Sequence, residues 1–203
     1  IERDARAVYP NAPVRTVWNG VAPQPTPDHS PPAPSPTAAG WRERLSMRDE
    51  EWLLVCVANP RPQKRLDRLP PILATLRQRG RPARLVVAGE ASRGHAPAAD
   101  ELRKLTTAAQ ALGVADQVTV SGALDDGQLA SLLSVADALI SASAYEGLSL
   151  AHLEALQAGT PVVATDVGGT AEIGGRETGL WLVPPEAETG TFADALASAI
   201  EGA

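Results

Sequence analysis

The sequence contains a single cysteine, Cys56, among its 203 residues. One cysteine excludes an intrachain disulfide and provides no cysteine framework for a metal. Cys56 lies within the apolar run WLLVCVA, which indicates a buried, inert thiol rather than a reactive one. No signal peptide is recognisable, and no apolar stretch is long enough to cross a bilayer. We therefore expect a cytoplasmic location, with any membrane association residing in a part of the protein outside this chain.

The sequence also lacks a run of basic residues, and its net charge is −6. Neither nucleic acid nor an anionic membrane surface is expected as a partner. The GxGxxG fingerprint is absent after the first apolar run, which argues against NAD or FAD, and the absence of GxxxxGK[ST] excludes P-loop nucleotide hydrolysis. No Ser-His-Asp or Cys-His set and no metal-ligand spacing stands out. Asp125 and Asp126 directly precede a helical run, so capping is favoured over metal binding.

The first fifty residues differ from the rest in composition. Residues 1–20 are interpreted as the remnant of a preceding domain, with a short strand at 14–20 closed by an Asn-Gly turn. Residues 21–50 are interpreted as a proline-rich linker with a short helix near 37–47, since residues 21–40 hold seven prolines. Because the strand at 14–20 would have lost its own sheet, we expect its edge to be free or to pair with another copy.

From residue 51 to 203, short apolar runs alternate with helical segments. Strands are predicted at 52–59, 83–90, 117–122, 137–143, 161–166 and 179–185. Helices are predicted at 66–80, 96–114, 125–136, 148–158 and 191–200. Strands that are continuously rich in Val, Leu and Ile and alternate with helices are typical of a parallel sheet covered on both faces. The sequence therefore predicts an α/β fold, a Rossmann-like doubly wound parallel sheet of about six strands.

In such a sheet, ligands bind outside the carboxyl ends of the strands, so the loops there are the places to search. The loop after the first strand carries Asn59, Arg61 and Lys64. Arg61 offers a fork to phosphate oxygens and Lys64 a point charge. A solvated loop with ordinary charges explains this segment equally well. The glycine-rich turn after the fifth strand, DVGGTAE, also has two equally good interpretations. Its backbone N–H groups could bind an anion, or it could be an ordinary flexible turn.

The loop after the fourth strand is more informative. Gly147 permits a tight turn, Ser149 can cap the following helix, and the N–H groups of residues 148–150 then point outward at a positive helix end. A phosphate fits there without a side-chain charge. Glu154 projects from the same helix and can accept two hydrogen bonds from a ribose diol, while Glu146 lies nearer to whatever the phosphates carry. The alternative for Glu154 is a charge on a wet helix face, but the helix is crowded with small and apolar groups. His152 is interpreted as a surface or packing residue.

The chain resembles the C-terminal donor-binding domain of the retaining GT-B glycosyltransferases of group 1, or GT4. The resemblance is carried, in order, by the segments VANPRPQKRLDRL, ARLVVAGE and LGVADQVTVSG through AGTPVVATDVGG. The resemblance covers residues 51–201, and its most specific element is the E-x7-E spacing of Glu146 and Glu154. It implies the C-terminal half of a GT-B fold, a cleft shared with a missing N-terminal acceptor domain of the same protein, and a fragment with little activity alone. It also implies metal-independent transfer from a nucleotide sugar, with UDP or GDP as the nucleotide and no further cofactor.

The resemblance implies roles for individual residues. Lys64, helped by Arg61, neutralises the departing diphosphate; Glu146 lies beside the donor sugar; Glu154 holds the ribose. The backbone around the diphosphate and base comprises Gly147, Leu148, Ser149, Leu150, Val120 and Gly122. This chain departs from the family pattern at Ala58-Asn59, where Gly-Arg is common, and at Arg65, where glycine is common.

Two other readings of the function stay open at this point. A GT-B epimerase or phosphorylase relative is expected to carry other acid-base residues in the cleft, and no such set is visible. A non-catalytic α/β interaction domain of receiver type needs an acidic cluster after its early strands, and VCVANP offers none. The base, the sugar and the acceptor, whether glycan, lipid or small molecule, are not specified by this sequence.

Overall fold

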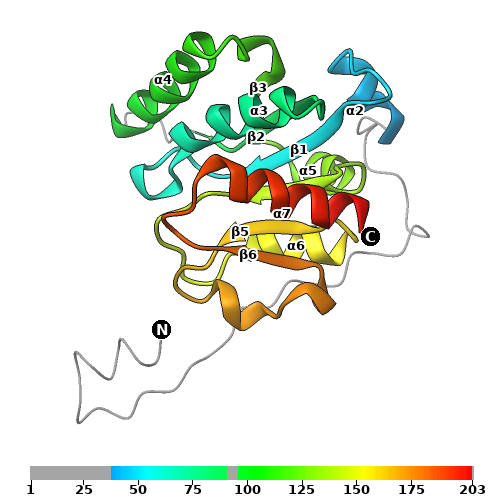
Figure 1. Ribbon diagram of the computed structural model, residues 1–203, viewed down its shortest axis with the longest axis vertical. Coiled ribbons are helices and arrows are strands. Elements are labelled where there is room, and N and C mark those ends of the chain that lie inside the picture. Colours follow the sequence, from blue (N-terminus) through cyan, green and yellow to red (C-terminus); the bar gives the residue numbers. More distant parts are fainter. Residues whose placement is uncertain (1–37, 91–95, 203) are drawn as a thin grey trace.

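A computed structural model describes residues 38–90 and 96–202 of the chain. Six parallel strands form one sheet in the order β3-β2-β1-β4-β5-β6 (Figure 1). The strands are β1 Trp52–Val57, β2 Ala83–Ala88, β3 Val118–Gly122, β4 Ala138–Ser141, β5 Val162–Thr165 and β6 Leu180–Val183. All six predicted strands and the parallel doubly wound sheet are confirmed. The strand expected at 14–20 lies outside the described residues.

Helices cover both faces of this sheet (Figure 1). The α-helices are α2 Ala38–Arg44, α3 Leu69–Gln78, α4 Ala96–Ala111, α5 Asp126–Leu133, α6 Leu150–Gln157 and α7 Thr189–Glu201. Short 3-10 helices occupy the connections, among them η1 Pro62–Lys64 and η4 Thr170–Ile173. The five helices predicted beyond residue 51, and the short one near 37–47, are all present.

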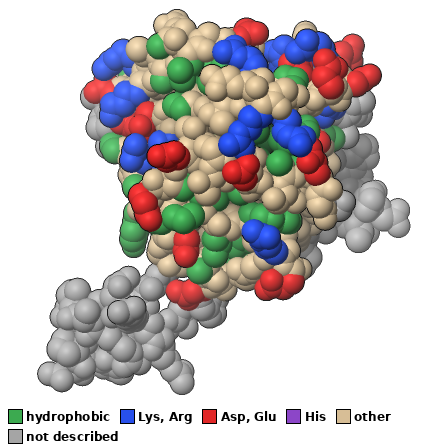
Figure 2. All heavy atoms as spheres, viewed as in Figure 1, with side chains coloured by type: hydrophobic (Ala, Val, Ile, Leu, Met, Phe, Trp, Pro, Cys, Tyr) green, Lys and Arg blue, Asp and Glu red, His purple; other side chains and the backbone are tan. Residues whose placement is uncertain are grey.

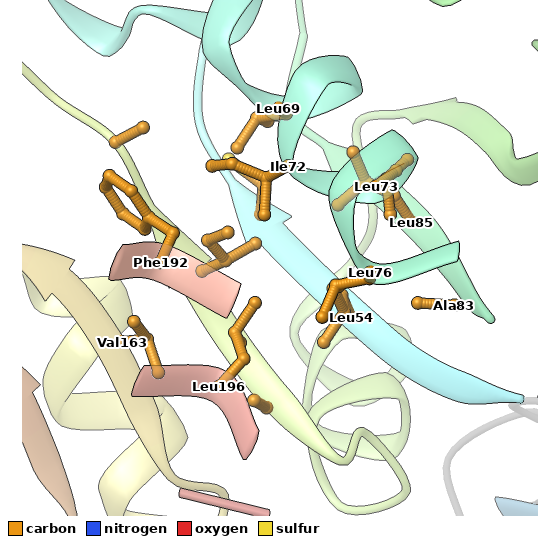
Figure 3. Close-up of a cluster of buried hydrophobic side chains, with 14 of the residues drawn as sticks. Leu54, Leu69, Ile72, Leu73, Leu76, Ala83, Leu85, Val163, Phe192 and Leu196 are labelled. Atoms are coloured by element: carbon orange, nitrogen blue, oxygen red, sulfur yellow. The ribbon is translucent and has the colours of Figure 1, made fainter. Parts of the chain in front are cut away.

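The larger core cluster lies between the sheet and α3, α4 and α7. Alternate strand residues such as Leu54 and Leu85 point into it, because successive side chains of a strand face opposite sides of the sheet. Ile72 of α3 and Phe192 of α7 meet them, and each is at most 1% exposed. Figure 3 shows these side chains interlocked between the strands and the two helices. This packing makes α3 and α7 fixed supports for the loops that precede and follow them.

The second cluster lies on the opposite face, beneath α2, α5 and α6. Leu53 and Val55 of β1 point into it, one residue out of step with the first cluster. Trp41 of α2 is 4% exposed and packs in the same cluster. The Arg42 guanidinium donates to the Glu51 carbonyl at 2.7 Å and pairs with Asp137 at 3.4 Å. The helix α2, expected within the linker, is thus attached to the sheet.

Helix ends follow the signals in the sequence. Pro70 and Pro71 occupy the first turn of α3, where a missing N–H costs nothing. Asp125 caps α5 and forms a capping box with Gln128, which confirms capping as its role. Gly80 and Gly113 take left-handed backbone angles just after α3 and α4. The strand-end loops therefore start from well-defined positions.

Cys56 is buried in the larger cluster, and burial raises the pKa of its thiol to about 12. The expectation of an inert thiol agrees with that environment. On the face drawn in Figure 2, basic and acidic side chains are interspersed rather than gathered by sign. No helix within the described ranges is long and apolar enough to span a membrane.

Candidate functional site

The order of the strands places a crevice at the middle of the sheet. β1 connects outward to β2, whereas β4 connects outward to β5 on the other side, so the loops after β1 and β4 diverge from neighbouring strands. Ligands of doubly wound sheets bind at such a switch point, outside the carboxyl ends of the strands. The predicted residues Lys64 and Glu146 come from these two loops.

Lys64 and Glu146 form an ion pair across the crevice. The Lys64 Nζ lies 2.6 Å from the Glu146 Oε1, and the two side chains are 21% and 10% exposed. The same Oε1 accepts a hydrogen bond from the Ser143 hydroxyl at 2.7 Å. The Ser143 hydroxyl oxygen in turn lies 3.3 Å from the hydroxyl oxygen of Ser141, the last residue of β4. A buried carboxylate needs such partners, because an unpaired charge away from water is costly.

Backbone contacts hold the surrounding loops together. The Ala144 N–H donates to the Gln63 carbonyl at 2.7 Å, which joins the loops after β1 and β4. The Thr165 hydroxyl, at the end of β5, donates to the Ser143 carbonyl at 2.5 Å. Three successive strand-end loops are thus connected around the ion pair. The site is built on neighbouring strand ends and does not depend on one flexible loop.

The glycine-rich turn after β5 has a role that neither sequence-based reading included. Gly168 has φ +56°, and a Cβ there would overlap the Glu146 carbonyl. The next residue, Gly169, donates its N–H to the Gly147 carbonyl at 2.8 Å. Only a glycine allows the two backbones to approach so closely in this conformation. The turn therefore fixes the loop that carries Glu146.

Helix α6 begins at this loop, with its amino end toward the crevice. Ser149 occupies the N-cap position and is 8% exposed, but its hydroxyl makes no capping hydrogen bond. The prediction that the Ser149 side chain caps α6 is therefore wrong, although the helix start is right. The first N–H groups of a helix have no acceptor within the helix. Without a side-chain cap, they are available to an anion.

Glu154 lies one turn further along α6 and is half-buried. Burial raises its pKa above the ordinary value, and the nearby Asp126 carboxylate raises it further. The Glu154 carboxylate makes no hydrogen bond or ion pair with residues 38–90 or 96–202. A partly buried carboxylate with unused acceptor oxygens is suited to hydroxyl donors such as a vicinal diol.

His152 of α6 occupies a packing position, one of the two that the sequence left open. It is 1% exposed, and its Nδ1 is buried without a hydrogen-bond partner in the described structure. Burial lowers its pKa to about 4, with Glu146 and Lys64 acting on it in opposite directions. The imidazole is therefore neutral at physiological pH and packs behind the ion pair.

The depressed pKa of His152 predicts acid-sensitive stability. Between pH 6.5 and about 4 the unfolded chain binds a proton at this imidazole and the folded chain does not. Stability is therefore complete above pH 6.5 and falls as the pH falls, by on the order of 3 kcal/mol at pH 4. Denaturant unfolding of the wild type and of His152→Leu across pH 4–7.5 measures this. The difference between the two curves isolates His152 from the carboxylates, and parallel curves would rule this effect out.

The other predicted site residues are distributed around the crevice. Arg61 is exposed and has no ion-pair partner among the described residues. Asn59, after β1, accepts a hydrogen bond from the Glu90 N–H after β2. Leu150 is 45% exposed at the start of α6. Leu148 is half-buried in the turn before it.

Val120 and Gly122 lie further from the ion pair, on the edge strand β3, two strands away from β1. Val120 is 39% exposed, and Gly122 accepts a hydrogen bond from the Gly89 N–H at 2.9 Å. The structure therefore brings Lys64 and Glu146 into contact and leaves the β3 residues at the far end of the same edge. Across the described residues, no group of three or more His, Cys, Asp or Glu side chains is placed to hold a metal ion.

Ser143 and Gly168 are the residues around the ion pair whose contacts sequence reasoning missed, and it left His152 open between a surface and a packing position. Ser143 stands three residues before Glu146, a spacing that hinted at a local contact. Gly168 was noticed as part of a glycine-rich turn, but its partner lies in another loop. Nothing local indicated that the His152 side chain faces the ion pair.

The comparisons with known proteins agree on one family. A profile of the family described as glycosyl transferases group 1 matches residues 39–203. The chain is 31% identical over 151 residues to an uncharacterized glycosyltransferase of Methanocaldococcus jannaschii, covering 71% of this chain and 36% of that protein. It is 32% identical over 155 residues to a GDP-mannose-dependent alpha-(1-6)-phosphatidylinositol monomannoside mannosyltransferase of Mycobacterium tuberculosis, covering 72% and 38%.

The fold has close counterparts among solved structures. The Anabaena protein HepE, solved in complex with UDP and glucose, superposes with a TM-score of 0.69 at 23% identity. The match covers 84% of this chain and 44% of HepE. The chain therefore spans less than half the length of each of these three proteins.

Proposed function

The chain belongs to the group 1 glycosyl transferases, and from that membership we propose that its sheet binds the nucleotide-sugar donor of a retaining, metal-independent transferase. The complete protein would transfer the sugar to an acceptor held largely by a second domain. The observation that carries the proposal is the Lys64–Glu146 ion pair, which lies at the switch point of the sheet beside the start of α6. The names of two relatives, a glycosyltransferase and a GDP-mannose-dependent mannosyltransferase, support it.

The diphosphate would lie between Lys64 and the amino end of α6. There the Lys64 ammonium and the uncapped N–H groups of α6 would stabilise the negative charge that builds on the departing diphosphate. Arg61 supplies a second, exposed cation on the same loop. Because fixed cations and a helix dipole provide this stabilisation, we propose that transfer proceeds without a divalent metal.

Glu146 and Glu154 would contact the remaining parts of the donor, the sugar and the ribose. Glu146 lies in the turn before α6 and would stand beside the donor sugar once Lys64 turns to the diphosphate. Glu154, half-buried and with free acceptor oxygens, would accept hydrogen bonds from both ribose hydroxyls. Retention of the anomeric configuration is part of the proposal through the family resemblance.

Calorimetric titration of the 203-residue chain with UDP, GDP and ADP tests the donor site. We expect one of these to bind, and we expect Glu154→Ala to weaken it ten- to a hundredfold, because hydrogen bonds to a charged acceptor contribute about 1.5–3 kcal/mol. Removing the ribose 2′-hydroxyl from the ligand should weaken binding to the wild type and leave binding to Glu154→Ala nearly unchanged.

Glu177→Ala serves as the matched control, since Glu177 is an exposed carboxylate before β6, away from the crevice. If none of the three diphosphates binds to the folded chain, the donor-site proposal is wrong. Equal responses of the Glu154 and Glu177 variants would remove the ribose role alone.

A further inference from the structure

A second hollow lies beside the proposed diphosphate site. It has a volume of about 300 Å³ and opens at the carboxyl ends of β1 and β2, next to the start of α5. Its apolar walls are formed by Val57, Ala88, Leu124 and Leu129, and its polar groups include Asn59 and Glu90. No lysine or arginine of residues 38–90 or 96–202 lines it. Apolar walls with a few placed polar groups suit a flat, uncharged ring better than a phosphate.

The hydrogen bond between Asn59 and Glu90 fixes the direction of the Asn59 amide. The Glu90 N–H donates to the Asn59 Oδ1 at 3.1 Å, and only the oxygen of the amide can accept it. The Asn59 NH2 group makes no hydrogen bond with the described residues and can donate to a ligand. The Glu90 carboxylate is exposed and makes no hydrogen bond or ion pair with any residue in the described ranges. Both residues line the hollow, so its lining includes an amide donor and a carboxylate.

The hollow also lies at the right place for the base of a bound nucleotide. Leu129 of its wall stands one turn of α5 beyond Asp126. The Asp126 carboxylate is close enough to Glu154 to raise the pKa of that group. A nucleoside whose ribose contacts Glu154 would thus lie alongside the start of α5, with the hollow next to it.

We propose that this hollow selects guanine, through Asn59 and Glu90, so that the donor is a GDP-sugar. The proposal rests on the proposed function and specifies its substrate. The Watson–Crick edge of guanine presents an acceptor (O6) and two donors (N1–H and the 2-amino group). These match the Asn59 NH2 group and the two oxygens of Glu90 in kind and number. With its O4 at the Asn59 NH2 group, uracil would offer N3–H to one Glu90 oxygen and turn its O2 carbonyl toward the other, and adenine would leave that carboxylate with a single donor.

The experiment is calorimetric titration of the chain with GDP, IDP and UDP. We expect GDP to bind at least tenfold more tightly than UDP, since a site built to accept hydrogen bonds rejects bases that lack the donors. IDP, which lacks only the 2-amino group, should fall between them. Glu90→Gln replaces one acceptor by a donor and should reduce the preference for GDP over UDP at least tenfold, with UDP affinity unchanged or improved.

Glu177→Gln is the matched control and should keep the wild-type preference. Thermal unfolding of each variant checks that the fold is intact. The proposal is overturned if UDP binds as tightly as GDP, or if Glu90→Gln weakens both nucleotides equally. If no nucleoside diphosphate binds at all, the donor site fails together with its base preference, which separates the two outcomes.

Discussion

Replacing Lys64 by alanine is expected to lower the free energy of unfolding by about 3 kcal/mol and to weaken nucleoside diphosphate binding about a hundredfold. The loss of stability follows from Glu146, whose carboxylate is 10% exposed and would keep only the Ser143 hydroxyl as a partner. Removing one member of a buried ion pair leaves the other charge buried without a partner, which is destabilising. The loss of binding follows from the missing cation. Denaturant unfolding and calorimetry measure the two effects separately.

The double variant Lys64→Met, Glu146→Gln separates stability from binding. It removes both charges at once, so its stability should return to within about 1 kcal/mol of the wild type. Its affinity for the diphosphate should stay as low as that of the single variant. A double variant that is stable and binds like the wild type would show that Lys64 is not the phosphate ligand. A double variant that stays as unstable as Lys64→Ala would show that the unpaired Glu146 charge is not the cause of the lost stability.

The substitution Gly168→Ala is expected to destabilise the chain by about 3 kcal/mol, because two costs combine. The left-handed backbone, with φ +56°, disfavours any Cβ, and the added methyl would overlap the Glu146 carbonyl. The loops after β4 and β5 must then separate. Since Glu146 belongs to one of these loops, its contact with Lys64 should loosen, and diphosphate affinity should change with it.

Gly80→Ala provides the control for this prediction. Gly80 also has a left-handed backbone, with φ +74°, but a Cβ there would meet nothing within 4 Å. Only the conformational cost remains, about 1 kcal/mol. Denaturant unfolding of both variants measures the difference, and equal losses would show that the contact between the loops is not tight.

The sequence was sufficient for the strands and helices, because each depends on local patterns. The apolar run at Leu53 and Val55, the prolines at the start of α3 and the glycine after its end can all be recognised from the sequence alone. The E-x7-E spacing likewise drew attention to Glu146 and Glu154. These signals placed the candidate site at the carboxyl ends of the strands, where the structure brings Lys64 and Glu146 into contact.

The contacts inside the site were not predictable in the same way. Lys64 and Glu146 are separated by 82 positions, and only the sheet order brings their loops together. The failed cap at Ser149 shows a related limit, since residue type predicts the position of a cap and the side-chain conformation decides whether it bonds. The buried His152 depends on which face of α6 meets the sheet beneath the ion pair. Tertiary packing determines all three.

The pairing of Lys64 with Glu146 bears on how a diphosphate would leave. If a diphosphate binds as proposed, it would take the Lys64 ammonium from the Glu146 carboxylate, which holds that ammonium in the structure. Departure reverses the exchange, and the protein's own carboxylate reclaims the cation. Because the ligand must break the Lys64–Glu146 ion pair to bind, part of its attraction to Lys64 is lost. This lowers the affinity for the diphosphate and shortens the time it stays bound. In the proposed transferase, which would release a nucleoside diphosphate after each turnover, such a competing carboxylate would favour product release over tight retention.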